Sequence, residues 1–440
     1  MLPYPGDKAA DVTCRLLPPM HRLLRAFRYV VEDSGLPMSR VWRQGLLVVL
    51  QALALLALVG CAMVTRNAVP SRSLAQSATL PDFKGVRFWG DEVPKDFAGE
   101  LRRRLPSFKQ TGYAAQRIDG RPLVQILALS GGGPNGAFGA GVLAGWTRRG
   151  DRPPFEVVTG VSAGAIIAPF AFLGARYDRR LKEIWTQYET TELVTTQVLP
   201  GLLGGTALAD TAPLRALVEK YVDERMLAEI AREYRKGRIL LIGTTNLDAQ
   251  RPVVWNMGEI ASSTAPEAIG LFRDIIMASA AIPGAFPPVN IKVLADGQAY
   301  DEMHVDGGTT RQVFVEPVLA PFRAFDSLYD KPPIRRFWII ANGKIGPQHE
   351  PVPPQTIPIA MKAIQTLLVN QNNGDLYRIY RMAQDADADF NLIAVPQSFT
   401  AKSNQAFDPQ YQSALFDTGF RLGRAGTGWA KEPPLLRAQP

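Results

Sequence analysis

The middle and C-terminal parts of the chain alternate between short apolar runs and stretches with helical spacing. The run 124–129 has the length and composition of a buried strand, and a glycine-rich turn and a helix to about Arg149 are predicted to follow it. The run 155–159 is predicted as a second strand, which leads through Ser162 into a helix that reaches about Leu173.

The same alternation continues toward the C-terminus. Further strands are predicted at 238–247, 252–257, 337–342 and 390–395, and a helix at 271–286 that Pro283 ends. The turn between the first two of these strands carries Asp248 and Gln250, and Asp248 is expected to shape that turn. Strands and helices in this order predict an α/β fold with a mainly parallel central sheet and helices on both faces.

Residues 62–120 do not follow this pattern, because they are rich in Ser, Pro, Arg and Asp and have weak periodicity. The regular pattern begins only at Val124. The predicted organisation is a signal region at 1–60, a tether and N-terminal extension at 61–120, a catalytic core at 121–325, and C-terminal strands and helices packed on the core at 326–440.

The N-terminal region has the three parts of a secretory signal: basic residues, an apolar run from Leu46, and a small-residue site that ends at Cys61. The ending Leu-Val-Gly-Cys resembles a bacterial lipobox, in which the cysteine is diacylated and becomes the first residue. Met38 lies 23 residues before Cys61, a normal signal-peptide length. Translation is therefore expected to start at Met38, with residues 1–37 untranslated.

A lipidated Cys61 predicts a cell envelope lipoprotein held to the membrane through that residue. Ala62 in the next position, rather than Asp, resembles lipoproteins of the Gram-negative outer membrane. A plain membrane-spanning anchor is the alternative, since the segment from Leu46 to Val64 is nearly long enough to cross a bilayer. After cleavage the mature chain would hold no second cysteine to pair with Cys61.

The amino-acid composition excludes few classes of function. Apolar residues make up 46% of the chain and charged residues 20%, which are ordinary globular values. The net charge of +8 is spread along the chain instead of forming one basic stripe, so no nucleic-acid partner is predicted.

The first candidate for chemistry is Ser162, which lies between Gly160 and Gly164 directly after a predicted strand and before a predicted helix. A sharp strand-to-helix turn of this kind exposes a serine hydroxyl at the end of a sheet, above a helix N-terminus. The pattern Gly-x-Ser-x-Gly also occurs by chance, so its position after an apolar strand is what favours a nucleophile.

The second candidate is the glycine run Gly131, Gly132 and Gly133, which follows the strand at 124–129. Successive glycines let backbone N–H groups approach an anion closely. The same stretch matches a dinucleotide-binding turn. That function would need an acidic residue at the end of the next strand, where this chain has Thr-Gly-Val-Ser. An oxyanion hole for Ser162 is therefore the better interpretation.

A serine nucleophile requires a base, and the chain has three histidines. His304 lies on a predicted strand and is expected to be a packed, hydrogen-bonded residue, and His349 looks like a loop histidine. Asp306 is more suggestive, because the two glycines that follow it permit a tight turn at a strand end. Asp296, also followed by glycine, has nearly the same local sequence, and spacing does not decide between the two.

Four motifs in order, "SGGGPNGAFGAG", "GVSAG", "ASAAIPGAFPPV" and "DGG", resemble the patatin-like phospholipase family over roughly Leu127 to Gly308. The resemblance implies a three-layer α/β/α fold and lipid acyl hydrolysis by a Ser-Asp dyad without a catalytic histidine. Ser162 would be the nucleophile and Asp306 the base, with Gly131, Gly132 and Gly133 lining the oxyanion hole. Neither a metal nor a cofactor is expected.

One position departs from the family. Many members have a basic residue where this chain has Asn135, which makes a preference for phospholipid head groups less secure than acyl transfer itself. A hydrolase of other acyl esters or thioesters, an acyltransferase with the same dyad, and a non-catalytic envelope lipoprotein remain alternatives. The apolar, glycine-rich stretch 198–210 would cover the acyl pocket or dip into lipid, or else form a buried connection.

Overall fold

A computed structural model describes residues 66–93, 116–196, 205–316 and 322–434. The chain divides into two compact units, Met1–Val64 and Thr65–Pro440, and all described residues belong to the second. None of the described helices has a stretch long and apolar enough to cross a bilayer.

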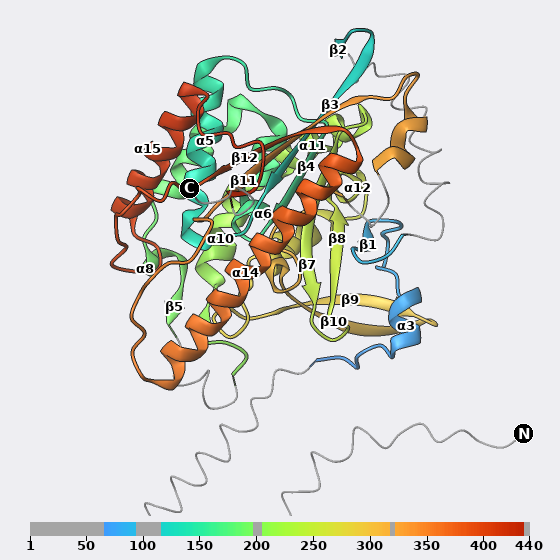
Figure 1. Ribbon diagram of the computed structural model, residues 1–440. Helices are drawn as coiled ribbons and strands as arrows, with labels where there is room; N and C mark the ends of the chain where they lie inside the picture. The colour runs from blue at the N-terminus through green and yellow to red at the C-terminus, as the bar shows by residue number, and fades with distance from the viewer. Residues whose placement is uncertain (1–65, 94–115, 197–204, 317–321, 435–440) are drawn as a thin grey trace, which may run out of the picture. The chain divides into compact units, whose positions relative to one another are not determined.

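Five neighbouring parallel strands form the centre of the sheet. In spatial order they are β7 (Ile239–Asn246), β4 (Val157–Val161), β3 (Arg121–Leu129), β11 (Ile334–Ala341) and β12 (Ala388–Ala394). Each of them overlaps an apolar run that predicts a strand, and the α/β fold with a mainly parallel sheet is confirmed (Figure 1).

The remaining strands pair in antiparallel fashion. They are β1 (Arg87–Trp89) on β8 (Arg251–Asn256), β8 on β7, β10 (Gln298–Asp306) on β7 and on β9 (Val289–Ala295), β2 (Arg117–Ile118) on β3, and β5 (Thr195–Thr196) on β6 (Ala209–Asp210). The predicted β7–β8 turn and the predicted strand that carries His304 are both present.

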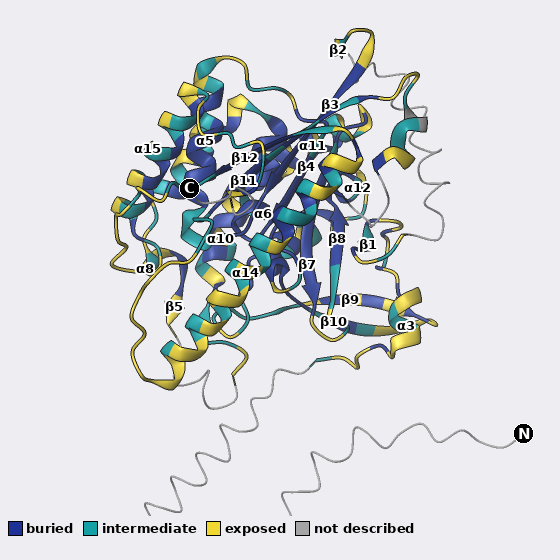
Figure 2. Ribbon diagram, viewed as in Figure 1, coloured by how far each residue is buried: buried dark blue, intermediate teal, exposed yellow. Residues whose placement is uncertain are grey.

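Both faces of the sheet are covered, as a parallel sheet requires. Alternate residues of β3 show this, since Leu127 and Leu129 belong to one apolar cluster and Ile126 and Ala128 to another. The helices are α3 (Arg72–Ser77), α5 (Gly136–Arg149), α6 (Ala163–Leu173), α7 (Asp178–Thr186), α8 (Thr190–Leu193), α10 (Ala212–Tyr221), α11 (Glu224–Arg235), α12 (Met257–Ser262), α13 (Ala268–Ser279), α14 (Thr356–Asp385) and α15 (Pro409–Ala425). Helices α5 and α6 contribute to the first cluster and α14 to the second, so the strands between them are mostly buried (Figure 2).

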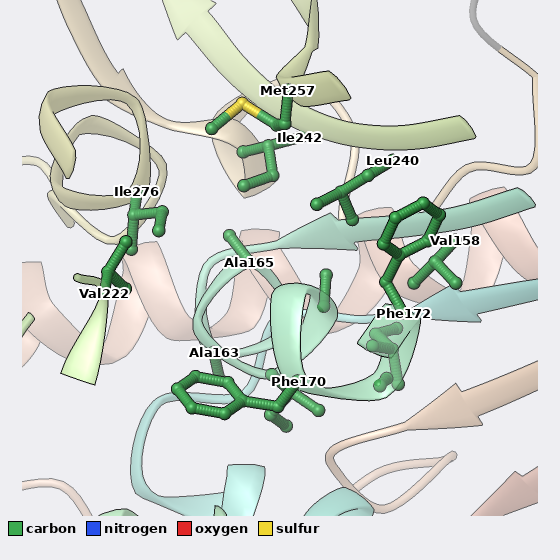
Figure 3. Packing of buried hydrophobic residues seen from close by; sticks show 14 of the residues in the cluster. Val158, Ala163, Ala165, Phe170, Phe172, Val222, Leu240, Ile242, Met257 and Ile276 are labelled. Atoms are coloured by element: carbon green, nitrogen blue, oxygen red, sulfur yellow. The ribbon is translucent and has the colours of Figure 1, made fainter. Parts of the chain in front are cut away.

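Helix α6 packs directly on the central strands. Figure 3 shows Phe172 against Val158 and Leu240, which come from β4 and β7. On the other side of the helix, Ala163 and Phe170 face away from these strands. The packing of Phe172 therefore attaches the C-terminal part of α6 to β4 and β7.

Most predicted strands are shifted by two or three residues at an end, and two boundaries differ more. Regular structure begins well before Val124, because α3, β1 and β2 precede it and β3 itself starts at Arg121. The short edge strand β1 is tied down by an ion pair between Arg87 and the buried Glu302, a contact that leaves no periodic signal. Helix α13 ends at Ser279, four residues before the proline expected to stop it.

Candidate active site

Ser162 occupies a sharp turn between β4 and α6. It is the N-cap residue of α6, with φ of 54° and ψ of −122°, and it is 5% exposed. A non-glycine residue in such a conformation destabilises the fold by on the order of 1–3 kcal/mol, so contacts with the surrounding structure must offset this strain. Here the Ser162 N–H donates to Ser279 Oγ at 3.0 Å, and Ser279 Oγ donates to the carbonyl of Gly243 at 2.6 Å.

Gly160 and Gly164 permit this turn because neither position has room for a side chain. A Cβ at Gly160 would lie 2.4 Å from the carbonyl oxygen of Gly164, and a Cβ at Gly164 would lie 2.2 Å from that of Leu129. The start of α6 therefore touches the ends of both β3 and β4. The predicted strand–serine–helix elbow is present in the structure.

The register on β7 brings Asp306 to Ser162. Along one edge of β7, β4 ends with Val161 opposite Gly243, and β10 ends with Asp306 opposite Thr244. The two strands therefore meet end to end, which brings the Ser162 hydroxyl within reach of a side-chain hydrogen bond to the Asp306 carboxylate.

The Asp306 carboxylate is buried, with 2% of the residue exposed. Burial raises its pKa to about 6, although hydrogen bonds from the Ser162 hydroxyl and the Gly308 N–H favour the charged form. The Gly308 N–H lies 2.7 Å from Oδ1 and so orients the carboxylate. A carboxylate with a pKa in this range is ionised at neutral pH and can still accept a proton.

The glycine run lies beside the serine. A Cβ on Gly131 would come within 3.2 Å of Ser162 Cβ, and one on Gly132 would lie 2.0 Å from the carbonyl oxygen of Asn342. The Gly131 N–H is already used, because it donates to the carbonyl of Gln312 at 3.1 Å. The N–H groups of Gly132 and Gly133 donate to no acceptor in the described part of the chain.

Residues that the sequence analysis did not single out hold this loop. Asn342, just after β11, donates through its N–H to Ser130 Oγ and through Nδ2 to the Ser130 carbonyl, each at 2.8 Å. Asp375 of α14 accepts the Gln312 N–H at 2.6 Å. Asn342 and Asp375 come from distant parts of the chain, so no local motif points to them. Ser279 lies within a quoted motif, but nothing in the motif indicates its contact with Ser162.

An apolar cavity of about 290 Å³ opens beside the serine. Gly133, Pro134 and Ser162 lie on its wall. Its other lining side chains are mostly aliphatic or aromatic and come largely from α6, α7, α10 and α13: Ala163, Ile166, Phe170, Ile184, Trp185, Leu214, Leu217, Val218, Tyr221, Ile276 and Ala280. Ala163, Phe170 and Ile276 are among the side chains drawn in Figure 3.

His304 lies on β10 but takes no part in this arrangement. Thr244 Oγ1 accepts from Trp255 Nε1, so its own hydrogen is available for His304 Nδ1 at 2.9 Å. The other ring nitrogen, Nε2, lies 3.4 Å from Glu302. Burial lowers the pKa of His304. It is the packed, hydrogen-bonded residue that the sequence predicts.

The other candidates occupy peripheral positions. His349 is exposed in a loop, and Asp296 forms the exposed turn between β9 and β10 with φ of 48°. Asp248 accepts the Met303 N–H at 2.8 Å, so its side chain joins the β7–β8 turn to β10, while the side-chain bond within the turn comes from Asn246, whose Oδ1 accepts the Ala249 N–H at 3.0 Å. Asn135, at the position where relatives carry a basic residue, accepts a hydrogen bond from Tyr411 at 2.7 Å. Cys61 and residues 198–204 lie outside the described residues.

The chain was compared with protein families, curated proteins and solved structures, and the family comparison agrees with the motifs. Residues 127–319 match the family model described as patatin-like phospholipase. No curated protein matches the chain. Among solved structures, the crystal structure of VipD from Legionella pneumophila is similar, with 10% identity and a TM-score of 0.35. That match covers 69% of this chain and 66% of VipD, just under two thirds of that protein.

The matched segment contains the elbow serine, the glycine run and the Asp-Gly-Gly turn. Residues 127–319 are thus identified as a patatin-like phospholipase domain.

Proposed function

We propose that the protein cleaves carboxylic esters of lipids, with Ser162 as the nucleophile and Asp306 as its only base. The observation that carries this proposal is the strand register that places the Ser162 hydroxyl beside the buried Asp306 carboxylate, at the wall of an apolar cavity. A serine hydroxyl becomes a useful nucleophile only when a neighbouring group accepts its proton. Among the described residues, Asp306 is the titratable group in that position.

In the first half-reaction, Ser162 Oγ attacks the ester carbonyl while Asp306 accepts the hydroxyl proton. The carbonyl oxygen gains negative charge as the tetrahedral intermediate forms. Collapse of that intermediate breaks the ester bond, and Asp306 returns the proton to the departing alcohol. In the second half-reaction, water gives a proton to Asp306 and attacks the acyl-enzyme. Asp306 then passes this proton to Ser162 Oγ as the bond between Oγ and the acyl group breaks, which releases the fatty acid and restores Ser162.

The N–H groups of Gly132 and Gly133 are the donors for the developing oxyanion. Both lack an acceptor among the described residues, and Gly133 shares the cavity wall with Ser162. Preformed donors of this kind stabilise the transition state more than the substrate. Gly131 would contribute to the oxyanion hole by its small size, since its own N–H is bound to Gln312.

The apolar lining of the cavity indicates that the acyl chain is the part of the substrate that binds there. Its lining offers large apolar area and few polar groups, so the ester's alkyl chain would be desolvated in it while the alcohol part points outward. Asn135 carries no charge for a phosphate, and its oxygen is bound to Tyr411. The proposal therefore specifies a lipid acyl ester without a preferred head group.

A fluorophosphonate probe and a lipid extract test this function together. Wild-type protein is expected to be labelled by the probe and to release fatty acids from the extract, because both reactions need the activated serine. Ser162→Ala should do neither. Equal labelling of the two proteins would contradict the serine assignment, and released products that are not fatty acids would contradict the reaction type.

The same dyad would serve an esterase, a thioesterase or an acyltransferase. Initial rates on matched oxygen esters and thioesters, with and without an added acyl-accepting alcohol, separate these reactions. Transfer to the alcohol faster than to water would identify an acyltransferase. A protein that folds but turns over none of these substrates would be the non-catalytic lipoprotein.

We further propose that Cys61 is diacylated and holds the protein in the cell envelope, at the outer membrane. The motif that supports this lies outside the described residues, so the proposal depends on the sequence alone. Mass spectrometry of the mature N-terminus is expected to find a lipidated Cys61 as the first residue. An unmodified N-terminus upstream of Cys61 would instead indicate a membrane-spanning anchor.

A further inference from the structure

Helix α14 extends well past the sheet that it covers. It has 30 residues and is about 45 Å long, whereas the eight residues of β11 span about 26 Å. Only its C-terminal part is packed, through the buried residues Asp375, Leu376, Ile379 and Ala383. Figure 1 shows its other end extending away from the central strands, and Figure 2 shows that end as exposed or half-buried.

The projecting half begins beside the candidate active site. Gln371 donates to the carbonyl of Thr310 at 2.9 Å, and Asp375 accepts the Gln312 N–H. These contacts attach α14 to the loop that directly follows Asp306. Residues 356–370 then continue for about 22 Å beyond that loop. They form the surface that we call the α14 overhang.

The overhang is apolar although it faces solvent. Eight large apolar side chains are exposed in the described part of the chain, and four of them lie between positions 352 and 367: Val352, Ile357, Ile359 and Leu367. Ile359 is 53% exposed and Leu367 is 70% exposed. Val352 lies in the loop before α14 and the other three lie on the overhang. Exposed apolar side chains that gather in one region are a mark of an interaction site.

Charge on the overhang is nearly absent. Lys362 is its one ionisable residue, and its ammonium lies 2.6 Å from the carboxylate of Glu350 in the preceding loop. The hydrogen bond and charge of Lys362 lower the pKa of the Glu350 carboxyl group, and the charge of Lys402 lowers it further. Lys402 belongs to the segment that leads to Ala406 and Phe407 on the cavity wall. The overhang thus carries no unpaired charge, and its C-terminal end is the one attached to the active-site loop.

We infer that the α14 overhang docks into the surface of a lipid bilayer, which places the cavity beside its substrate. An apolar helix with almost no net charge fits the boundary between head groups and acyl chains, and burial of its side chains there is favourable. The inference rests on the proposed function, because a lipid substrate supplies the reason for a lipid surface at this edge. Docking would be driven by apolar contact and would not require anionic lipid.

The double variant Ile359→Glu with Leu367→Glu tests the docking in the full-length protein. The assay uses two esters of the same fluorogenic alcohol. The long-chain ester is embedded in phosphatidylcholine vesicles, and the short-chain ester is in solution. The variant is expected to lose at least about tenfold of its rate on the embedded ester. Its rate on the soluble ester should match wild type, because neither side chain belongs to the core or the cavity.

Leu294→Glu is the matched control, since Leu294 is 37% exposed on β9 and away from α14. It should retain the wild-type rate on both esters, and thermal unfolding of all three proteins checks their folding. A double variant that hydrolyses the embedded ester at the wild-type rate would overturn the inference.

A second measurement does not depend on turnover. Vesicles with a photoactivatable acyl chain should label wild-type protein on the tryptic peptides 345–362 and 363–378. The label should be lost from the double variant and kept in the Leu294→Glu protein. If wild type hydrolyses neither ester but is labelled there, the proposed function fails while the docking stands. If these peptides carry no label in wild type, the docking is wrong.

Discussion

Asp306→Asn is expected to lower kcat/KM for ester hydrolysis by about 100- to 10,000-fold, the usual contribution of a general base. Asparagine has nearly the same shape, and its oxygen can still accept the Gly308 N–H that orients residue 306. It cannot take the proton of Ser162. Purified variants assayed on a soluble ester give the comparison directly.

The pH dependence provides an independent measurement of the same base. Burial raises the pKa of Asp306 to about 6, and only the ionised carboxylate can accept a proton. Wild-type kcat/KM should therefore be low below this pH and should rise as the pH increases through it. A profile without a rise near pH 6 would contradict the assignment.

His304→Gln is the control for a conventional triad. His304 is bound to Thr244 and Glu302 within the sheet, and glutamine can keep hydrogen bonds there. We expect this variant to retain most of its activity, with unfolding temperature as the check on folding. An active Asp306→Asn protein together with an inactive His304→Gln protein would show that the base is the histidine.

Gly164→Ala is expected to destabilise the fold by about 1–3 kcal/mol and to abolish turnover. The added Cβ would lie 2.2 Å from the carbonyl oxygen of Leu129 and 2.8 Å from that of Ser130. Both are backbone atoms, so the clash cannot be relieved by a side-chain rotation. The start of α6 must move away from the end of β3, which separates Ser162 from the glycine run.

Gly270→Ala is the matched control for this substitution. Gly270 lies in α13, where an added Cβ would have no other atom within 4 Å and where φ is not positive, so alanine should be neutral or stabilising. Thermal unfolding and ester hydrolysis measure both effects. A Gly164→Ala protein with wild-type stability and activity would show that the elbow tolerates a side chain.

The elements that the sequence predicts best are those whose signal is local. Apolar runs such as 124–129 and 155–159 form central strands because burial on both faces demands apolar residues at successive positions. The edge strand β1 is not predicted, because its three residues are half-buried and show no such pattern. It is held by the ion pair between Arg87 and Glu302.

The local sequence does not determine which of two similar aspartates belongs to the site. Asp296 and Asp306 are each followed by glycine at the end of a strand. Only the register decides between them, since β10 pairs with β7 so that Asp306 meets the end of β4, while Asp296 lies in the exposed hairpin turn. The resemblance to a family favours Asp306, but the spacing of the residues does not.

By itself, the sequence determined the order of strands and helices, the turn that carries Ser162 and the glycine run before it, because these follow from neighbouring residues. Tertiary structure alone decided which carboxylate meets the serine, which N–H groups remain without an acceptor among the described residues, and where α14 projects. Ser279, Asn342 and Asp375 support the site from positions far away in the chain. Such contacts depend on strand register and helix packing, which bring distant residues together and leave no mark in the local sequence.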